Sequence, residues 1–448
     1  MTELLPYQKD GVRAIYNLKG RALLADEQGL GKTIQSLDWI RRLKSARPVL
    51  IVCPSSVKYT WQDEAVNHFG IRASVIEGNR PKRCMTLPSK IVIINYDILK
   101  SWLPALLRNQ CAILILDEIQ YIKNHETIRS RACHQLAVNA RSVVGLSGTP
   151  FTNECIELWS VLQAIRPDVF PERSAFAWRY TKPMRYRGKW HFKGSKHEGE
   201  LNRILKETVM IRRLKKDVAK DLPDKRRKII RFKLPNFSEY QKAEDDFRGW
   251  LHAISPAKAK RARRAEAMLK VGYLLRLAAK LKRKWVKQWI QDFLDNNPGQ
   301  KLCCFSMHTD TIEYFEAAFR QRCVVINGSV TGIKRHEAVR KFQNNRKIDL
   351  MFGNWKAAGV GLTLTASSNI AALDIPFTPG DMKQAEDRIH RIGQKFKCMI
   401  YYLLAMNTRE EVQVATLKRK DKILGAIIDG TKKTKSLDMF DEIIKSMK

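Results

Sequence analysis

The segment from Ala25 to Thr33, ADEQGLGKT, combines residue types that bind nucleotide phosphates. Its glycines let backbone N–H groups approach phosphate oxygens, and the start of the following helix adds about half a positive charge. The Lys32 ammonium can reach the terminal phosphates, and the Thr33 hydroxyl can ligate Mg²⁺. The general phosphate-loop pattern has a glycine where this chain has Asp26, so the match rests on the G-x-G-K-T core. An ordinary glycine turn is the alternative; the strand before the loop and the helix after it favour a nucleotide site.

Two adjacent carboxylates, Asp117 and Glu118, follow the apolar run CAILIL. Side chains at the carboxyl end of a strand in a parallel sheet face the crevice where such sheets bind ligands. We predict that Asp117 holds Mg²⁺ through water and that Glu118 orients or deprotonates the water that attacks phosphate. A solvated acidic turn is the alternative, and the phosphate loop upstream makes it the weaker interpretation.

Two arginines near the end of the chain, Arg388 and Arg391, lie in the segment QAEDRIHRIGQ. A helix up to Gly393 would place them on one face with Gln384, at steps of four and three residues. Arginines of this kind can stabilise the charge of a phosphoryl-transfer transition state. Taken alone, the pattern fits a surface ladder of salt bridges equally well, so the interpretation depends on the other two motifs.

Buried strands must position these residues, and short apolar runs bounded by loops recur in two series. The first series comprises residues 21–25, 48–54, 90–96, 111–118 and 142–150; the second comprises residues 301–306, 323–328, 348–354 and 369–376. We predict an α/β protein with two parallel-sheet domains, at residues 1–160 and 281–429. A basic helical insertion and linker at 161–280 separates them, and a lysine-rich tail occupies 430–448.

The composition indicates a globular protein with an anionic partner. Of 448 residues, 44% are hydrophobic and 28% charged, and the formal net charge is +37. Such an excess favours nucleic acid over a merely basic solvated surface. No apolar run reaches the roughly 20 residues of a membrane helix. The nine cysteines contain no C-x-x-C pair and indicate reduced core thiols. We expect no membrane association and a cytoplasmic location, or a nuclear one in a eukaryote.

The stretch from Pro256 to Lys287 is the most basic part of the predicted insertion. It holds twelve Lys or Arg residues and one acidic residue, Glu266. A basic helical segment can be a solvated face, a membrane-surface helix or a grip on the phosphate backbone. The charge of the whole chain favours the last of these.

The ordered motifs resemble those of the Swi/Snf-type ATPases, within the superfamily-two helicase-like motors. The resemblance runs from Pro6 to about Lys418 through PYQKDGV, DEQGLGKT, IVCPSSVKYTWQDE, INYD, LDEIQ, GLSGTP, MIRRLKKDVAKDLPDK, GVGLTLTAS and QAEDRIHRIGQ. The tract FAWRYTKPMRYRGKWHFKGSKHEGEL looks most like the annealing-helicase branch. The resemblance implies two tandem RecA-like domains, ATP and Mg²⁺ as cofactors, and Arg388 and Arg391 as arginine fingers.

The resemblance also implies roles for residues that the motifs alone do not explain. Gln8 would contact adenine, and Gly361 would lie near both nucleotide and DNA. The phosphate loop would surround the nucleotide with Asp26, Glu27, Gln28, Gly29, Leu30, Gly31, Lys32 and Thr33. The residues expected to couple to or contact DNA are Pro54, Ser55, Trp61, Ser147, Thr149, Ser306 and Thr363.

The implied activity is DNA-stimulated ATP hydrolysis by a monomer that translocates on double-stranded or forked DNA without reading its sequence. Alternatives are a strand-separating helicase, an RNA-directed ATPase and a DNA-binding scaffold without turnover. Gln120, where many relatives carry histidine, motivates the scaffold reading, because it puts the coupling of the two domains in doubt. The segment NIAALDIPFTPGDMKQ also lacks a tryptophan common in relatives, so local DNA contacts are expected to differ.

Overall fold

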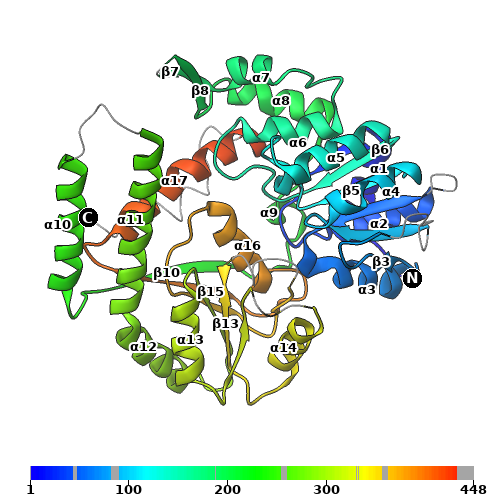
Figure 1. Ribbon diagram of the computed structural model, residues 1–448. Helices are drawn as coiled ribbons and strands as arrows, with labels where there is room; N and C mark the ends of the chain where they lie inside the picture. Colours follow the sequence, from blue (N-terminus) through cyan, green and yellow to red (C-terminus); the bar gives the residue numbers. More distant parts are fainter. Residues whose placement is uncertain are drawn as a thin grey trace. The chain divides into compact units, whose positions relative to one another are not determined.

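The computed structural model describes residues 2–43, 48–81, 90–186, 188–253, 260–328, 330, 332–355 and 362–430. The chain forms two compact units, whose elements are labelled in Figure 1. Unit 1 extends to Leu222 and includes the end of the last helix from Lys420, and unit 2 extends from Pro223 to Arg419. Each unit is built on its own parallel sheet.

The sheet of unit 1 has seven strands, and all neighbours pair in parallel. Every residue of β2, β4 and β6 is buried, as expected where helices cover both faces of a sheet. In spatial order the strands are β3 (Ser74–Val75), β4 (Ile91–Asn95), β2 (Val49–Cys53), β5 (Ile113–Asp117), β6 (Ser142–Leu146), β1 (Arg21–Leu24) and β9 (Met210–Ile211).

The other elements of unit 1 are helices and one separate hairpin. The helices are α1 (Pro6–Asn17), α2 (Lys32–Arg42), α3 (Lys58–Phe69), α4 (Leu99–Arg108), α5 (Ile128–Asn139), α6 (Glu157–Ile165), α7 (Arg173–Tyr180), α8 (Glu198–Thr208) and α9 (Lys215–Val218), with short 3₁₀ turns at Ser55–Val57 and Ile119–Ile122. The hairpin consists of β7 (Lys182–Tyr186) and β8 (Lys189–Lys193).

The order of the strands explains why distant motifs meet in unit 1. Strands β5, β6, β1 and β9 are neighbours, and all four run in the same direction. Their carboxyl ends therefore lie at one edge of the sheet, where ligands bind in such folds. The carboxylate pair begins at the last residue of β5, GLSGTP extends from β6, the phosphate loop follows β1, and the paired arginines of MIRRLKK follow β9.

Unit 2 contains a six-stranded parallel sheet. Its order is β10 (Lys225–Phe232), β15 (Cys398–Ala405), β14 (Asn369–Ala372), β11 (Leu302–Ser306), β13 (Leu350–Asn354) and β12 (Cys323–Ile326). The helices are α10 (Phe237–Ala253), α11 (Lys260–Leu281), α12 (Arg283–Asn296), α13 (Thr309–Ala318), α14 (Gly332–Asn344), α16 (Pro379–Ile389) and α17 (Arg409–Ile428), whose last turns belong to unit 1.

The predicted α/β class with two parallel sheets is confirmed, and every predicted apolar run contains a strand. The division of the chain differs from the expected one. The first unit continues past residue 160 to Leu222, because β9 completes its sheet beside β1. The second begins at Pro223 because β10 pairs with β15 over eight residues. The sequence of β10, KRRKIIRF, is too charged to resemble a buried strand.

The described part of the chain contains no helix long and apolar enough to cross a membrane. Its cysteines are all free, and all but the half-buried Cys323 lie in the interior. The same residues form no cluster of three or more side chains that could hold a metal ion.

Candidate active site

The phosphate loop joins β1 to α2 through two glycines in the left-handed region. Gly29 has φ +87° and Gly31 has φ +76°, which side chains rarely adopt. A Cβ on Gly31 would also meet the Gln8 amide nitrogen at 2.5 Å. The Lys32 Nζ donates to the Asp26 carbonyl at 2.8 Å and to Gln28 Oε1 at 3.4 Å. Burial lowers the pKa of Lys32 to about 8, an effect that the Glu118 and Asp26 carboxylates oppose.

The carboxylate pair is held by side chains from three segments. Asp117 Oδ2 accepts from the Trp61 indole at 2.8 Å, and Oδ1 accepts from the Glu118 backbone at 2.9 Å. Glu118 has φ +50° and accepts from Gln120 Nε2 at 2.7 Å. Gln28 Nε2 donates to its other oxygen at 3.4 Å. Burial and the neighbouring Glu118 charge raise the pKa of Asp117 to about 7.

Gln28 joins the two motifs, because its amide oxygen accepts from Lys32 while its nitrogen donates to Glu118. Its side chain lies against Gly148 of GLSGTP, where a Cβ would meet Gln28 Cγ at 2.9 Å. Gln28 of the phosphate loop thus contacts both the carboxylate pair and the turn after β6. Among the residues predicted from the sequence, Lys32, Asp117 and Glu118 are brought together as expected.

Gln120 holds the Glu118 carboxylate in place through a hydrogen bond. Its nitrogen donates to Glu118 Oε2, whereas its buried Oε1 has no hydrogen-bond partner among the described residues. A histidine at this position could donate one hydrogen bond to the carboxylate from a ring nitrogen. The amide nitrogen of glutamine can donate the same hydrogen bond, so it can perform the same local task. The departure at Gln120 therefore leaves the geometry of the carboxylate pair intact.

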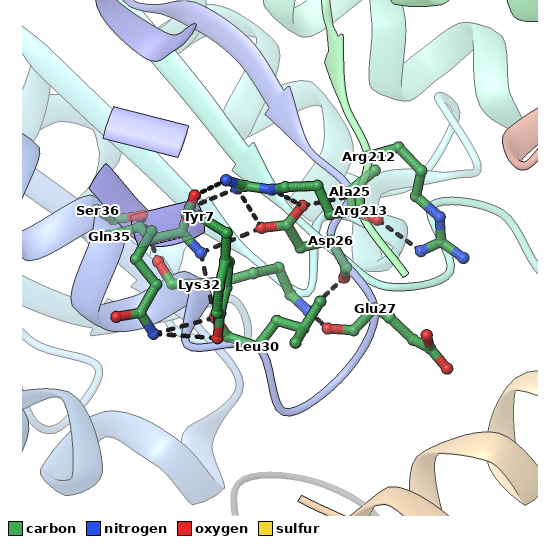
Figure 2. A network of polar contacts seen from close by, with 11 residues as sticks. Tyr7, Ala25, Asp26, Glu27, Leu30, Lys32, Gln35, Ser36, Arg212 and Arg213 are labelled. Atoms are coloured by element: carbon green, nitrogen blue, oxygen red, sulfur yellow. Dashed lines mark hydrogen bonds and ion pairs between the residues drawn. The ribbon is translucent and has the colours of Figure 1, made fainter. Parts of the chain in front are cut away.

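The Asp26 side chain is bound to the linker that follows β9. Its carboxylate is fully buried. It accepts hydrogen bonds from the Arg213 backbone N–H at 3.0 Å, from the Arg213 guanidinium at 2.9 Å and from Gln35 Nε2 at 3.1 Å (Figure 2). Arg213 also donates to the Tyr7 carbonyl and to Gln35 Oε1, the latter at 2.7 Å. Asp26 therefore anchors the linker arginine to the loop.

The Glu27 side chain is also directed to the linker. Its carboxylate accepts from the Lys215 backbone at 2.7 Å, at the start of α9. The Glu27 backbone donates to the Arg213 carbonyl at 3.0 Å. Next to it, Arg212 donates to the carbonyls of Ala25 at 2.6 Å and Gly148 at 3.2 Å, as Figure 2 shows for Ala25. Glu27 is therefore a structural contact of the loop.

Arg212 also contacts the residue that follows helix α17. Its guanidinium pairs with Asp429 at 2.8 Å, just after the end of α17. Asn202 of α8 donates to the carbonyl of Ile427 at 2.7 Å and to that of Ile428 at 3.1 Å. The end of α17 is thereby fastened to the strand edge that carries the phosphate loop.

Helix α1 is fixed against the loop at one carbonyl. The Leu30 oxygen accepts from the Tyr7 hydroxyl at 3.2 Å, from Gln8 Nε2 at 3.3 Å and from Gln35 Nε2 at 3.2 Å. Gly11 faces Gln35 and Arg213 so closely that a Cβ would collide with both side chains. The glycine of PYQKDGV is therefore required for the approach of α1, and Gln8 lies next to the loop.

Four of the seven residues expected to couple to or contact DNA are buried. Trp61 is 1% exposed and donates to Asp117, so it positions that carboxylate. Ser147 is fully buried and accepts from the Thr149 backbone at 3.0 Å, and Ser306 is fully buried against Asp374. Pro54 is buried, Thr149 is half-buried, and Ser55 and Thr363 are exposed. Of the seven, only Ser55 and Thr363 are exposed.

The two arginines of unit 2 meet at one carbonyl, although only one lies in the helix. Helix α16 ends at Ile389, so the predicted helix up to Gly393 is four residues too long. Arg388 donates to the Leu362 oxygen at 3.3 Å and Arg391 donates to it at 3.4 Å. Arg391 also donates to Thr363 Oγ1 at 2.9 Å. Gly361, the residue before this carbonyl, lies outside the described residues.

An ion-pair network holds α16 against the sheet. Glu386 is 1% exposed and binds Lys225 at 2.7 Å, Arg227 at 2.7 Å and the Tyr402 hydroxyl at 2.6 Å. The guanidinium of Arg227 and the ammonium of Lys225 hold the pKa of the Glu386 carboxyl well below its usual range, against the effect of burial. The charges that made β10 difficult to identify are thus paired with the helix that carries Arg388.

Sequence reasoning missed Arg212, Arg213 and Gln35 as parts of the site. The only signal was the arginine pair inside MIRRLKK, which lies nearly two hundred residues after the loop it contacts. Nothing local in that segment indicates its partners. Gln35 lies on the buried face of α2, where an apolar residue is the usual choice.

We predict that Asp26→Ala destabilises unit 1 by about 3–5 kcal/mol, because it leaves the Arg213 guanidinium without its buried carboxylate. Thermal unfolding of the variant, of Arg213→Ala and of the double variant would measure this. The free energy of unfolding should fall clearly less in the double variant than the two single losses added together. Asp10→Ala removes the exposed Asp10–Arg13 pair and serves as the control, with a change within about 1 kcal/mol. Additive losses would contradict the network.

Comparison with known proteins gives an independent assignment. A family model described as the SNF2-related domain matches residues 7–288, and the helicase conserved C-terminal domain matches residues 284–393. The human DNA annealing helicase and endonuclease ZRANB3 is 33% identical over 96% of this chain. The SWI/SNF-related matrix-associated actin-dependent regulator of chromatin subfamily A-like protein 1 of Xenopus tropicalis is 31% identical over 95% of this chain.

An uncharacterized ATP-dependent helicase of Mycoplasma genitalium is 27% identical over 92% of this chain. The chain covers 41% of the human protein, 45% of the Xenopus protein and 41% of the Mycoplasma protein. It therefore spans less than half the length of these relatives.

Proposed function

This chain belongs to the SNF2-related family of helicase-like ATPases, and we propose on that basis that it couples ATP hydrolysis to movement along double-stranded or forked DNA. The family assignment makes it an ATP-hydrolysing enzyme. The proposal extends this to translocation without processive strand separation, in which DNA structures or DNA–protein complexes are remodelled. The human relative named a DNA annealing helicase supports remodelling over long-range unwinding.

One observation carries the hydrolytic part of the proposal. A continuous set of polar contacts runs from Lys32 through Gln28 to Glu118, next to Asp117. Lys32 provides positive charge for the terminal phosphates, while Glu118 is a carboxylate that can accept a proton from an attacking water. Gln120 and Gln28 hold Glu118 by donating to both of its oxygens, so its remaining acceptor capacity can be directed at water.

The residues fit ATP with Mg²⁺. The glycine loop leads into the N-terminus of α2, where backbone N–H groups and the helix dipole favour phosphate. Thr33 on this first turn and Asp117 across the loop supply the hard oxygen ligands that Mg²⁺ prefers. When bound, the ion neutralises charge that develops on the phosphate oxygens. Trp61 holds Asp117 in place by its indole hydrogen bond, and the contact of Gln8 with the loop at Leu30 supports its proposed part in adenine binding.

We further propose that Arg388 and Arg391 act as arginine fingers toward the same nucleotide, and that unit 2 is needed for turnover. Their shared contact with the Leu362 carbonyl supports a common role, because it places both guanidinium groups beside the GVGLTLTAS segment. Glu386 supports it indirectly by fixing the helix that carries Arg388. DNA binding without sequence preference is proposed from the net charge of +37.

The test is ATPase stimulation across nucleic-acid structures. We expect blunt duplex and forked DNA of unrelated sequence to stimulate turnover strongly, with weaker stimulation by single-stranded DNA and RNA. Each phosphate contact releases counterions from the DNA. In a plot of the logarithm of the binding constant against the logarithm of the salt concentration, each contact should therefore add about −0.9 to the slope. Stimulation by RNA alone would contradict DNA as the substrate. Robust displacement of long strands from a partial duplex would show a strand-separating helicase instead.

A further inference from the structure

An exposed aromatic cluster lies on unit 1, in the β7–β8 hairpin and helix α7, apart from the phosphate loop. Trp178 of α7 is 44% exposed and Trp190 of β8 is 47% exposed. Their ring centroids are 4.6 Å apart with an interplanar angle of 68°, and Phe192 lies 5.8 Å from Trp178. We call Trp178, Trp190 and Phe192 the hairpin cluster; the hairpin and α7 lie side by side in Figure 1.

The register of the hairpin sorts its residues onto two faces. Paired residues in an antiparallel ladder share a face, and successive pairs alternate. Trp190 pairs with Arg185 and Phe192 pairs with Pro183, which places all four on the face that contacts Trp178. Lys182 pairs with Lys193 on the other face. The aromatic rings are therefore bordered by Arg185 on their own face and by two lysines behind them.

The hairpin cluster is not required to close the hydrophobic core. In α7, Phe176 and Tyr180 are buried in the core of unit 1, whereas Trp178 points to the opposite side. The base of the hairpin is held by polar contacts instead: the Gly194 backbone donates to Glu154 at 2.7 Å, and the Lys196 backbone donates to the Tyr180 carbonyl at 3.0 Å. A firmly held support that exposes two tryptophans is typical of a binding surface.

The charge of this segment selects an anionic partner. Between Arg173 and His197 there are eight lysines or arginines and no aspartate or glutamate. Glu172 directly precedes this segment and is exposed, whereas after it Glu198 accepts from the Ser195 hydroxyl at 2.6 Å and Glu200 pairs with Arg179 at 2.6 Å. Exposed aromatic rings within a positive surface match the chemistry of unpaired nucleotides, whose bases stack on rings while their phosphates meet cations.

We propose that the hairpin cluster binds unpaired bases of DNA, as an accessory site for the single-stranded part of a junction. The proposal rests on the proposed DNA-dependent function and names the feature of the substrate that this surface recognises. Bases within a duplex already stack on one another and offer no free face, so the cluster distinguishes splayed from fully paired DNA. An acidic protein segment would use the lysines and Arg185 but would gain little from two tryptophan rings.

The experiment measures the affinity of the full chain for three fluorescent probes: an oligo(dT) strand, a splayed fork with two unpaired arms, and a blunt duplex of the same length. We expect the double variant Trp178→Ala with Trp190→Ala to bind oligo(dT) and the splayed fork about 10-fold or more weakly. Its affinity for blunt duplex and its ATPase rate at saturating blunt duplex should change by less than about twofold. Trp178→Phe with Trp190→Phe keeps aromatic faces and should retain most of the affinity for the fork.

Unchanged affinity of the alanine variant for oligo(dT) would overturn the proposal, as would an equal loss for all three probes, which indicates a general backbone grip or misfolding. Thermal unfolding of the variant identifies misfolding directly. Polyglutamate that competes with oligo(dT) as well as a second oligo(dT) strand does would also overturn it, in favour of an acidic protein partner. If wild-type protein is stimulated by no DNA at all, the proposed function fails instead.

Discussion

Glu118→Gln is expected to reduce DNA-stimulated ATP hydrolysis by about 10²- to 10⁴-fold, the usual contribution of a general base. The amide has nearly the same shape, so it keeps the volume of the carboxylate, but it cannot take a proton from water. Its nitrogen would also face Gln120 Nε2 or Gln28 Nε2, both of which now donate to Glu118. ATP binding should remain, because Lys32 and the glycine loop are unchanged. Steady-state turnover and equilibrium ATP binding on the same preparation would separate the two effects.

A matched control is Glu126→Gln, the same chemical change on an exposed carboxylate of the loop that follows. It should hydrolyse ATP at the wild-type rate. If Glu118→Gln retained wild-type turnover while binding ATP, the base would have to be a different group. Loss of ATP binding together with turnover would instead assign Glu118 to nucleotide affinity.

Arg391→Ala is expected to lower DNA-stimulated kcat by about 10³-fold or more, the contribution measured for arginine fingers in related phosphoryl transfers. The structure makes Arg391 the better variant of the pair, because it lies after the end of α16 and is less buried than Arg388, which is 7% exposed. Arg388→Ala should lower kcat as well but also remove packing and leave the Leu362 carbonyl with one donor fewer. Comparison of kcat, KM for ATP and thermal unfolding for both variants distinguishes these effects.

Arg391→Lys keeps a positive charge but loses the planar fork, so we expect only partial recovery over the alanine variant. Lys395→Ala removes an exposed cation from the same segment and is the matched control, with kcat within about twofold of wild type. DNA binding without ATP should persist in Arg391→Ala. Wild-type kcat in that variant would show that Arg391 has only its local contacts with Leu362 and Thr363.

The apolar pattern predicted much of the fold because strands buried on both faces carry an unbroken run of apolar residues. β2, β4, β5, β6, β11, β13 and β14 all show this pattern, and each lies inside a predicted run. β10 was missed because its charged residues are neutralised by α16, whose Glu386 lies about 160 residues later. β9 has only two residues, too few for any periodicity. The limits of the two compact units differ from the expected domain limits for the same reason, since β9 and β10 each complete a sheet far from their sequence neighbours.

The sequence by itself determined the chemistry that depends on local spacing. Gly29, Gly31, Lys32 and Thr33 adjoin one another, as do Asp117 and Glu118, so their types and order define a phosphate loop and a carboxylate pair. A spacing of three residues also paired Arg388 with Arg391, although the helix ends between them. Local geometry is encoded by neighbours in the chain, and these motifs could be read without a fold.

Only the tertiary structure decided which side chains serve the ligand and which serve the scaffold. Asp26 and Trp61 stand inside motifs where the resemblance placed nucleotide and DNA, yet one is buried against Arg213 and the other against Asp117. Arg212 of the linker contacts the start of the phosphate loop because β9 pairs with β1. Burial and hydrogen-bond partners follow from the order of strands in the sheet, and contacts between residues far apart in sequence leave no local pattern.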